Sequence, residues 1–162
     1  MQIPRWQQAY GRDYAFSGQT SLALAVPRLL QPLLRSSGDS IAPGLNGILV
    51  NWYDGMLGHY IGPHRDRYKE LVPGAPMVIF SFGEVADSLL VVRDVREPQR
   101  TLRFRPHRGK GFTDVQANDH GVVVFPFETN NVWKHEVPKT KKARGLRISV
   151  TAPAFHDTVS SD

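Results

Sequence analysis

The chain has 162 residues, of which 41% are hydrophobic and 22% charged, with a formal net charge of +5 and no cysteine. This length and composition are typical of one globular domain and exclude a disordered or fibrous chain. Without cysteine there are no disulfides, thiol nucleophiles or cysteine-bound metals, so any metal site must be built from histidine and carboxylate side chains.

The predicted elements, taken in chain order, are one helix and then many short strands. We expect the helical region over residues 20–36, where leucines recur at helical spacing and Pro27 and Pro32 should shorten or break it. Short segments rich in β-branched and aromatic residues predict strands over 46–53, 77–82, 88–92, 100–105, 121–127 and 145–152. This order favours a mainly β (α+β) sandwich or jelly roll with a short flanking helical region near the N-terminus.

The termini carry no targeting signal that we recognise. Residues 1–6 lack an apolar core of signal-peptide length, and no apolar run is long enough to span a membrane. We therefore expect a soluble, intracellular protein of the cytoplasm or nucleus, with no membrane partner and in monomeric form. The polar residues 156–162 are expected to be a frayed tail.

The most informative motif follows the strand predicted over 46–53. His64 and Asp66 are two residues apart, so an extended backbone would place both side chains on one face. His-x-Asp is a common tripeptide, and lone histidines are more often ordinary surface or core residues than ligands. His135, at the end of another strand-like segment, could complete a set of two histidines and one carboxylate. That set binds Fe(II) and leaves positions open for a co-substrate and O2.

A possible anion anchor lies twelve residues after His135. Arg147 is part of the alternating segment 146–151, which is typical of a strand. An arginine in this place could hold a dicarboxylate co-substrate through a bidentate pair, although a charged residue at a strand edge is the commoner explanation. Three ligand types and an anion anchor on strands in this order favour an iron site.

Taken together, these motifs resemble the AlkB family of Fe(II)- and 2-oxoglutarate-dependent dioxygenases over about Pro4 to Thr151. The resemblance rests on the following segments: Pro4-Arg5, Tyr10-Gly11, 14–18, Asn51 with Tyr53 and Gly55, 61–66, 70–83, His135 and Arg147. It implies a double-stranded β-helix (jelly roll) in one domain over residues 1–155, with residues 1–18 as a substrate-lid region.

The resemblance also implies roles for individual residues. Iron would be held by His64, Asp66 and His135. Asn51 and Tyr53 would hydrogen-bond 2-oxoglutarate, although ordinary strand packing would also explain Tyr53. Arg147 would pair with one carboxylate, and Ser149 stands in the same co-substrate motif.

Other matched positions concern the substrate. Tyr14 and Phe16 match positions that line the pocket for a flipped base, where aromatic faces can stack on it. Phe16 could equally pack on the core. Arg5 could touch a phosphate or be a solvated terminus.

Three departures from the family pattern bear on this interpretation. The family's C-terminal motif usually reads Arg-x-Asn-x-Thr-x-Arg, and its last position is Pro153 in this chain. The second arginine of the motif is therefore missing, and Arg103 or Arg105 could substitute for it. Tyr68 stands where an acidic residue often helps to read the damaged base, and it can stack or donate a hydrogen bond. The chain begins where relatives often have an upstream wedge hairpin, which favours single-stranded DNA or RNA as substrate.

The implied activity is oxidative demethylation of N-alkylated bases in DNA or RNA, which uses Fe(II), 2-oxoglutarate and O2. Its products would be formaldehyde, succinate and CO2. Two alternatives stay open at this point. The same iron chemistry could hydroxylate a protein side chain, a small metabolite or a carbon-bound methyl group, or the chain could be a non-catalytic nucleic-acid-binding module.

The positive charge is concentrated in two stretches. Residues 93–110 contain seven basic and two acidic residues, and residues 134–147 contain six basic and one acidic, so each has a net charge of +5. A charged stretch is often only a solvated surface, and for the first stretch this explanation is as good as a contact with nucleic acid. The second flanks His135, and we expect nucleic-acid phosphates to lie along both.

Overall fold

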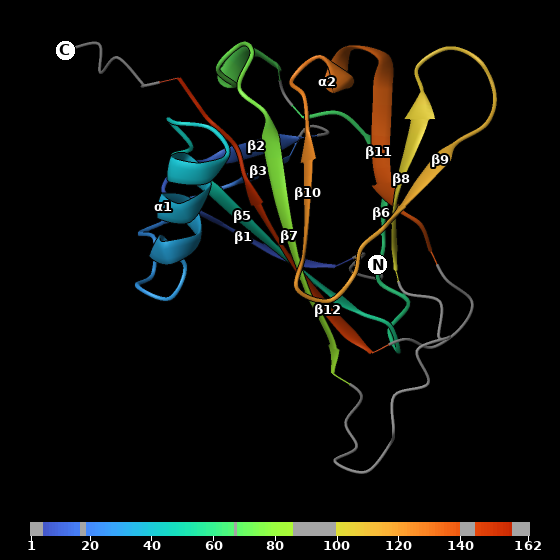
Figure 1. Cartoon of the computed structure of the whole chain (residues 1–162). Helices are drawn as coiled ribbons and strands as arrows, with labels where there is room; N and C mark the ends of the chain where they lie inside the picture. The colour runs from blue at the N-terminus through green and yellow to red at the C-terminus, as the bar shows by residue number, and fades with distance from the viewer. Residues whose placement is uncertain (1–4, 17–18, 67, 86–99, 140–144, 157–162) are drawn as a thin grey trace.

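The computed structural model describes residues 5–16, 19–66, 68–85, 100–139 and 145–156. Its core lies between two β-sheets (Figure 1). The larger sheet has the strand order β10 (Gly121–Phe125), β7 (Met77–Val85), β12 (Leu146–Ala152), β5 (Ile48–Asp54), β1 (Trp6–Tyr10), β4 (Ala23–Leu24). The smaller sheet has the order β6 (Ile61–His64), β11 (Trp133–Val137), β8 (Thr101–Pro106), β9 (Thr113–Gln116). A separate hairpin joins β2 (Tyr14–Phe16) to β3 (Gln19–Ser21).

Alternating burial along the strands decides which side chains enter the core. On β5, Leu49, Asn51 and Tyr53 are buried, whereas Trp52 between them is exposed. The inward side chains of the larger sheet pack against Leu102 and Val137 of the smaller sheet in one cluster. The fold is therefore mainly β and of the jelly-roll type, as predicted.

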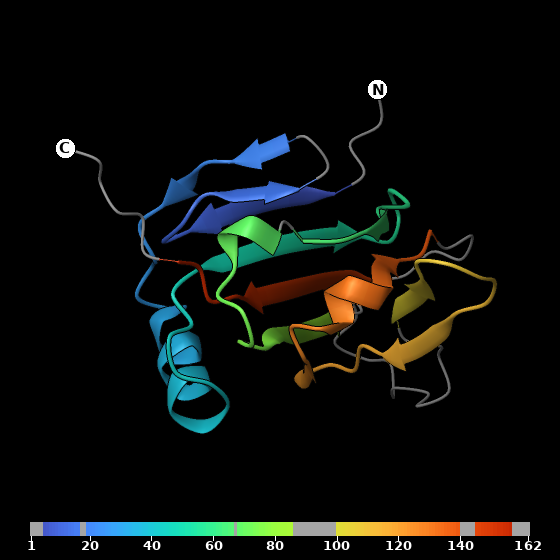
Figure 2. The ribbon, with the colours of Figure 1, turned by 90° about the horizontal axis from the view of Figure 1, so that it is seen from above.

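The helix differs from its prediction in position. Residues 19–21 and 23–24 form strands, and helix α1 covers Gln31–Ser40 rather than 20–36. Pro32 lies in the first turn, where its missing N–H costs no hydrogen bond, so this proline starts the helix instead of breaking it. Figure 2 shows α1 at one end of the larger sheet, and Leu34 packs there beside Val78 and Ala152.

Strands were predicted best where they are apolar. The predicted segments 46–53, 77–82, 100–105, 121–127 and 145–152 correspond to β5, β7, β8, β10 and β12, and the segment 88–92 lies outside the described residues. Short polar strands such as β1 and β9 carried no such signal. Two further short helical elements are η1 (Tyr68–Glu70) and α2 (Thr129–Val132).

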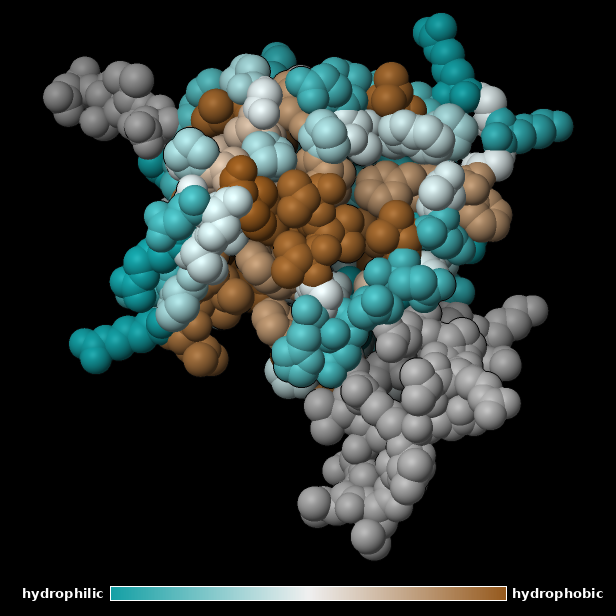
Figure 3. Space-filling view, in the orientation of Figure 1, coloured by the Kyte–Doolittle hydropathy of each residue, from teal (hydrophilic) through white to brown (hydrophobic). Residues whose placement is uncertain are grey.

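One face of the molecule has an apolar centre. Figure 3 shows hydrophobic surface in the region where β7 and β10 run. Val122 and Val124 of β10, the edge strand of the larger sheet, are about half exposed there, at 51% and 47%. Among the helices of the described residues, none is long and apolar enough to cross a membrane.

Candidate metal and co-substrate site

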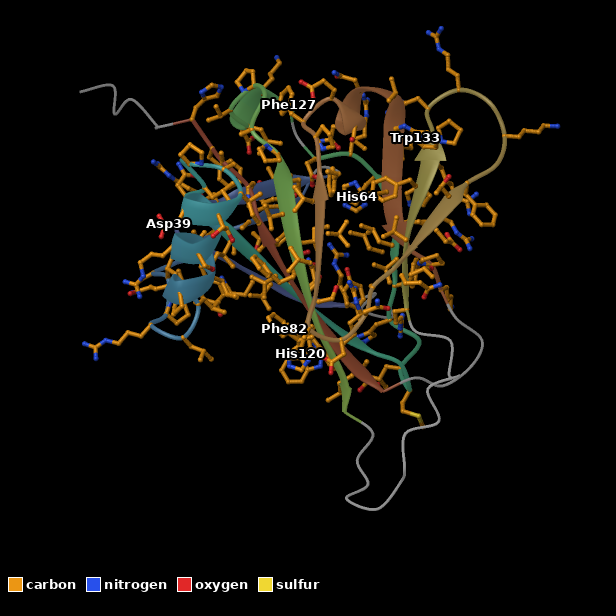
Figure 4. The ribbon with its side chains drawn as sticks, viewed as in Figure 1. Asp39, His64, Phe82, His120, Phe127 and Trp133 are labelled. Atoms are coloured by element: carbon orange, nitrogen blue, oxygen red, sulfur yellow. The ribbon has the colours of Figure 1, made fainter. Side chains whose placement is uncertain are left out.

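Two neighbouring strands of the smaller sheet bring the predicted metal ligands together. His64 at the end of β6 is paired with His135 of β11, and Asp66 follows two residues after His64. One ligand atom from each residue lies within 4.8 Å of the other two. His135 Nε2 is 3.7 Å from Asp66 Oδ2, and the two imidazole centroids are 4.3 Å apart. Figure 4 shows His64 in the interior, on the same side of the molecule as Trp133 at the start of β11.

The surroundings prepare His64 to act as a ligand. Its Nδ1 lies 2.9 Å from the Gly62 carbonyl oxygen, and an Nδ1–H that donates there fixes the tautomer in which Nε2 carries the lone pair that a metal requires. Burial, together with the nearby His135, lowers the pKa of His64 to about 4, although Asp66 opposes this shift. The imidazole is therefore neutral at neutral pH, which is the form that binds metals.

Asp66 is held by a tyrosine from the N-terminal hairpin. The Tyr14 hydroxyl donates a hydrogen bond to Asp66 Oδ1, and both side chains are buried. Burial, and after it the neighbouring Asp66, raises the pKa of Tyr14 well above its usual value. Tyr14 therefore keeps its proton and orients the carboxylate as an outer partner of a metal ligand does.

Two imidazoles and one carboxylate within this distance suit Fe(II). Such a set occupies one face of the ion and leaves the opposite positions for other ligands. The three residues are therefore able to hold the predicted iron.

Arg147 provides the best evidence for a dicarboxylate. Its side chain is 3% exposed and its Nη2 donates to Ser81 Oγ at 2.9 Å. Nε and Nη1 are buried and have no hydrogen-bond partner within the part of the chain that the structure describes. A buried guanidinium with two unsatisfied donors is costly, and a carboxylate is the group that satisfies such a fork. Burial lowers the pKa of Arg147, and Tyr53 opposes this.

The other predicted co-substrate residues surround Arg147 in register. β12 pairs with β5 so that Arg147 lies opposite Tyr53 and Ser149 lies opposite Asn51. All four side chains are buried, and the Arg147 guanidinium lies 5.4 Å from the centre of the Tyr53 ring. These four residues line the same pocket as the three metal ligands.

The predicted substrate residues divide into two groups. Tyr14 and Arg5 are buried and line this pocket. Arg5 is therefore no solvated terminus in this structure. Phe16 and Tyr68 belong to β2 and η1, but their side chains lie outside what the structure describes.

The suggestion that Arg103 or Arg105 replaces the missing second arginine is wrong. On β8 the buried residues are Leu102 and Phe104, so the two arginines point to the opposite face of the sheet. Arg103 forms a bidentate pair with Asp114 at 2.7 and 2.8 Å, and Arg105 pairs with Glu136 at 2.6 Å. Neither lines the pocket.

Sequence reasoning missed Ser81, which holds Arg147. Ser81 is 2% exposed and lies in the apolar strand β7, where Met77 and Ile79 are the inward residues before it. The sequence could have indicated Ser81, because it occupies the next inward position of an apolar strand and a buried hydroxyl requires a polar partner.

Comparisons with known proteins agree with this geometry. A sequence model of the 2OG-Fe(II) oxygenase superfamily matches residues 5–152. The protein named DNA oxidative demethylase ALKBH2 of Mus musculus is 31% identical over 156 residues, which cover 92% of this chain and 61% of that protein. Its counterpart in Homo sapiens is 30% identical over 157 residues, with 92% and 56% covered, and that of Bos taurus is 31% identical over 156 residues, with 92% and 52% covered.

The chain thus spans between about half and three fifths of the length of these relatives. The family match covers nearly the whole described chain, including the three metal-ligand candidates and Arg147. These relatives also confirm the resemblance to AlkB-like proteins that the motifs suggested. The chain belongs to the 2OG-Fe(II) oxygenase superfamily, the dioxygenases that use Fe(II), 2-oxoglutarate and O2.

Proposed function

We propose that this protein is an oxidative demethylase of N-alkylated bases in DNA or RNA. The observation that carries the proposal is that nine of the eleven predicted site residues line one pocket, the two others being Phe16 and Tyr68. The names of the relatives, DNA oxidative demethylases, support a nucleic-acid substrate.

In this proposal the chain's own residues bind and orient the reactants. His64, Asp66 and His135 would hold Fe(II), and Arg147, Asn51, Tyr53 and Ser149 would hold 2-oxoglutarate. When bound, these groups supply the oxidation of the methyl carbon by O2, with succinate, CO2 and formaldehyde as products. Apolar side chains of the pocket wall exclude water from the reacting groups; they include Leu49, Ile79 and Leu102.

The base would enter beside the N-terminal hairpin. The Tyr14 hydroxyl donates to Asp66, and its ring packs edge-on against Phe155 and lines the pocket, where a base would stack on it. Phe16 and Tyr68 remain predicted partners of the base, and residues 1–18 a predicted lid.

Among the described residues of the first basic stretch, some are already engaged within the protein and others are exposed to a nucleic-acid backbone. Arg100 is buried and donates to the His59 carbonyl oxygen at 2.8 Å, and Arg103 and Arg105 are paired with carboxylates. Within the described part of this stretch, residues 100–110, the exposed cations are Arg108 and Lys110, in the turn between β8 and β9. Residues 93–99 lie outside the described residues.

This turn is bonded to the segment that leads to His135. Phe112, which is 52% exposed, stacks under Arg103 at 3.7 Å. The His107 N–H donates to the Val132 carbonyl oxygen at 2.8 Å, which ties the turn to the segment leading to His135. In the second basic stretch, Arg147 lines the pocket and residues 140–144 lie outside the described part of the chain. Lys134 and Lys139 are the cations of this stretch that would contact phosphates.

Reversal of the charge in this turn should weaken nucleic-acid binding. For a single-stranded oligonucleotide, each lost phosphate contact lowers the slope of log affinity against log salt by about 0.7. The double variant Arg108→Glu/Lys110→Glu is therefore expected to reduce that slope by about 1.4, measured by fluorescence anisotropy. Arg35→Glu is the matched control, because Arg35 is an exposed cation of α1 on the far side of the molecule (Figure 1). Equal slopes for the two variants would contradict the assignment.

The proposed activity is tested by a screen of methylated DNA and RNA oligonucleotides, single-stranded and duplex, scored for loss of the methyl mass. We expect loss only with Fe(II) and 2-oxoglutarate present, and greater loss from single strands. Succinate formation without methyl loss from any oligonucleotide would contradict demethylation and favour hydroxylation of a protein side chain or small metabolite.

A further inference from the structure

The turn between β8 and β9 carries an exposed phenylalanine. Phe112 is 52% exposed, and the guanidinium carbon of Arg103 lies over its ring, 3.7 Å from the centroid. Because one face of the ring rests on an arginine, this exposure leaves much of the remaining ring surface open to solvent. A single exposed apolar residue is common on protein surfaces, so the meaning of this one depends on how the ring is held and on what surrounds it.

The ring of Phe112 rests on a fixed support. Arg103 makes two hydrogen bonds to the carboxylate of Asp114, its cross-strand partner on β9, at 2.7 and 2.8 Å. Arg105, which pairs with Glu136 at 2.6 Å, lies 5.3 Å from the same ring centroid. Since carboxylates hold both guanidinium groups, the ring is already positioned and loses little freedom when a partner stacks on it.

The charge of the turn favours an anionic partner. Residues 106–112 include two exposed cations, Arg108 and Lys110, and no carboxylate. Gly109 and Gly111 flank Lys110 at φ values of 103° and 101°, and a Cβ on either would meet nothing within 4 Å, so the space around this backbone is open. An aromatic ring beside exposed cations suits a single-stranded nucleic acid, whose bases stack on the ring and whose phosphates pair with the cations.

Strand register relates this turn to the metal ligands. Thr113, the residue after Phe112, is paired with Phe104, which is itself paired with His135. Neighbouring strands lie about 4.8 Å apart, so the backbone of Thr113 is roughly 10 Å from that of His135. The turn lies at the end of the smaller sheet where α2 leads into β11 (Figure 1). Phe112 packs on Arg103, which faces away from the pocket, so the ring is placed for a base outside the pocket.

We propose that Phe112 stacks on a base that flanks the target nucleotide in a single strand of nucleic acid, while Arg108 and Lys110 pair with the adjoining phosphates. This inference rests on the proposed function, because it describes how the same substrate is bound. In a duplex the bases are already stacked on their neighbours, so the ring finds no open base face there. Phe112 therefore supplies a physical cause for a preference for single strands.

The test is fluorescence anisotropy with an unmethylated single-stranded oligonucleotide, so that binding is measured without turnover. Phe112→Ala should weaken binding about fivefold to hundredfold, the usual effect of removing an aromatic side chain on which a base stacks. Phe112→Trp should retain the affinity, and the salt dependence of binding should be the same for all three proteins, because no phosphate contact changes. The matched control is Trp52→Ala, since Trp52 is similarly exposed, at 42%, but belongs to β5 of the larger sheet.

Two further probes separate stacking from other effects. A strand of the same length made only of abasic nucleotides keeps the phosphates and lacks the bases, and a duplex keeps the bases but stacks them internally. Phe112→Ala and the unaltered protein should bind each of these probes nearly equally.

The inference is overturned if Phe112→Ala binds the single strand as tightly as the unaltered protein does. It is also overturned if Trp52→Ala causes an equal loss, or if the abasic strand or the duplex loses as much affinity as the single strand. Methyl loss is scored separately, so the two proposals can fail independently. Methyl loss with an unaffected Phe112→Ala variant would support demethylation and refute the stacking role. The expected Phe112 effect without methyl loss from any oligonucleotide would support the stacking role and refute demethylation.

Discussion

Replacement of His135 by alanine should abolish succinate production and leave affinity for a methylated oligonucleotide nearly unchanged. His135 is one of only three metal-ligand candidates that the described structure brings together, and its Nε2 already lies 3.7 Å from Asp66. Mutation of a residue that only orients a metal ligand lowers metal affinity or activity about tenfold to hundredfold. Removal of a ligand itself should therefore lower succinate production at least about a hundredfold. Succinate is measured by mass spectrometry and oligonucleotide affinity by fluorescence anisotropy.

The matched control for this variant is His156→Ala. His156 is an exposed histidine at the end of the described chain, and its backbone N–H donates to the Glu70 carbonyl oxygen at 3.1 Å. The control should retain full succinate production. If His135→Ala keeps its activity, or if it loses oligonucleotide affinity to the same degree as turnover, then His135 is not the metal ligand that we assign.

Replacement of Arg147 by methionine is expected to separate function from stability. The 2-oxoglutarate concentration that gives half-maximal rate should rise about tenfold to hundredfold, because a charge-assisted bond to a carboxylate is lost. The melting temperature of the ligand-free protein should stay the same or rise, because methionine removes a buried charge whose Nε and Nη1 lack partners among the described residues.

Both quantities are needed to interpret the Arg147 variant. An arginine with a structural role would lower the melting temperature when replaced and would leave the 2-oxoglutarate requirement unchanged. That result would assign Arg147 to strand packing with Ser81 and Tyr53. Ser81→Ala offers a milder version, because it removes one fixing hydrogen bond and keeps the guanidinium.

The metal site could be predicted because short-range spacing determines most of it. His64 and Asp66 are two residues apart after an apolar strand, and only His135 had to be brought from a distant part of the chain. The alternation around Arg147 likewise predicted a strand, and that strand became β12. The local sequence pattern was sufficient to predict an element where β-favouring residue types recurred with the two-residue period of a strand.

The remaining features depend on contacts that spacing does not encode. Arg5 looks like any basic residue near a terminus until the sheet order places it beside Asn51. Arg103 and Arg105 share a strand with pocket residue Leu102, but they face away from it, since a strand alternates its faces. Helix α1 begins later than the leucine spacing predicts, because Ala23 and Leu24 pair with β1 as strand β4 and Pro32 lies in the first turn of the helix.

The central claim is that one pocket couples 2-oxoglutarate turnover to removal of a methyl group from a base. The most direct test measures formaldehyde and succinate together, in a single reaction on a methylated single-stranded oligonucleotide. The account predicts equal amounts of the two products, with both absent when Fe(II) or 2-oxoglutarate is omitted. Succinate without formaldehyde under these conditions, with every methylated oligonucleotide offered, would contradict it.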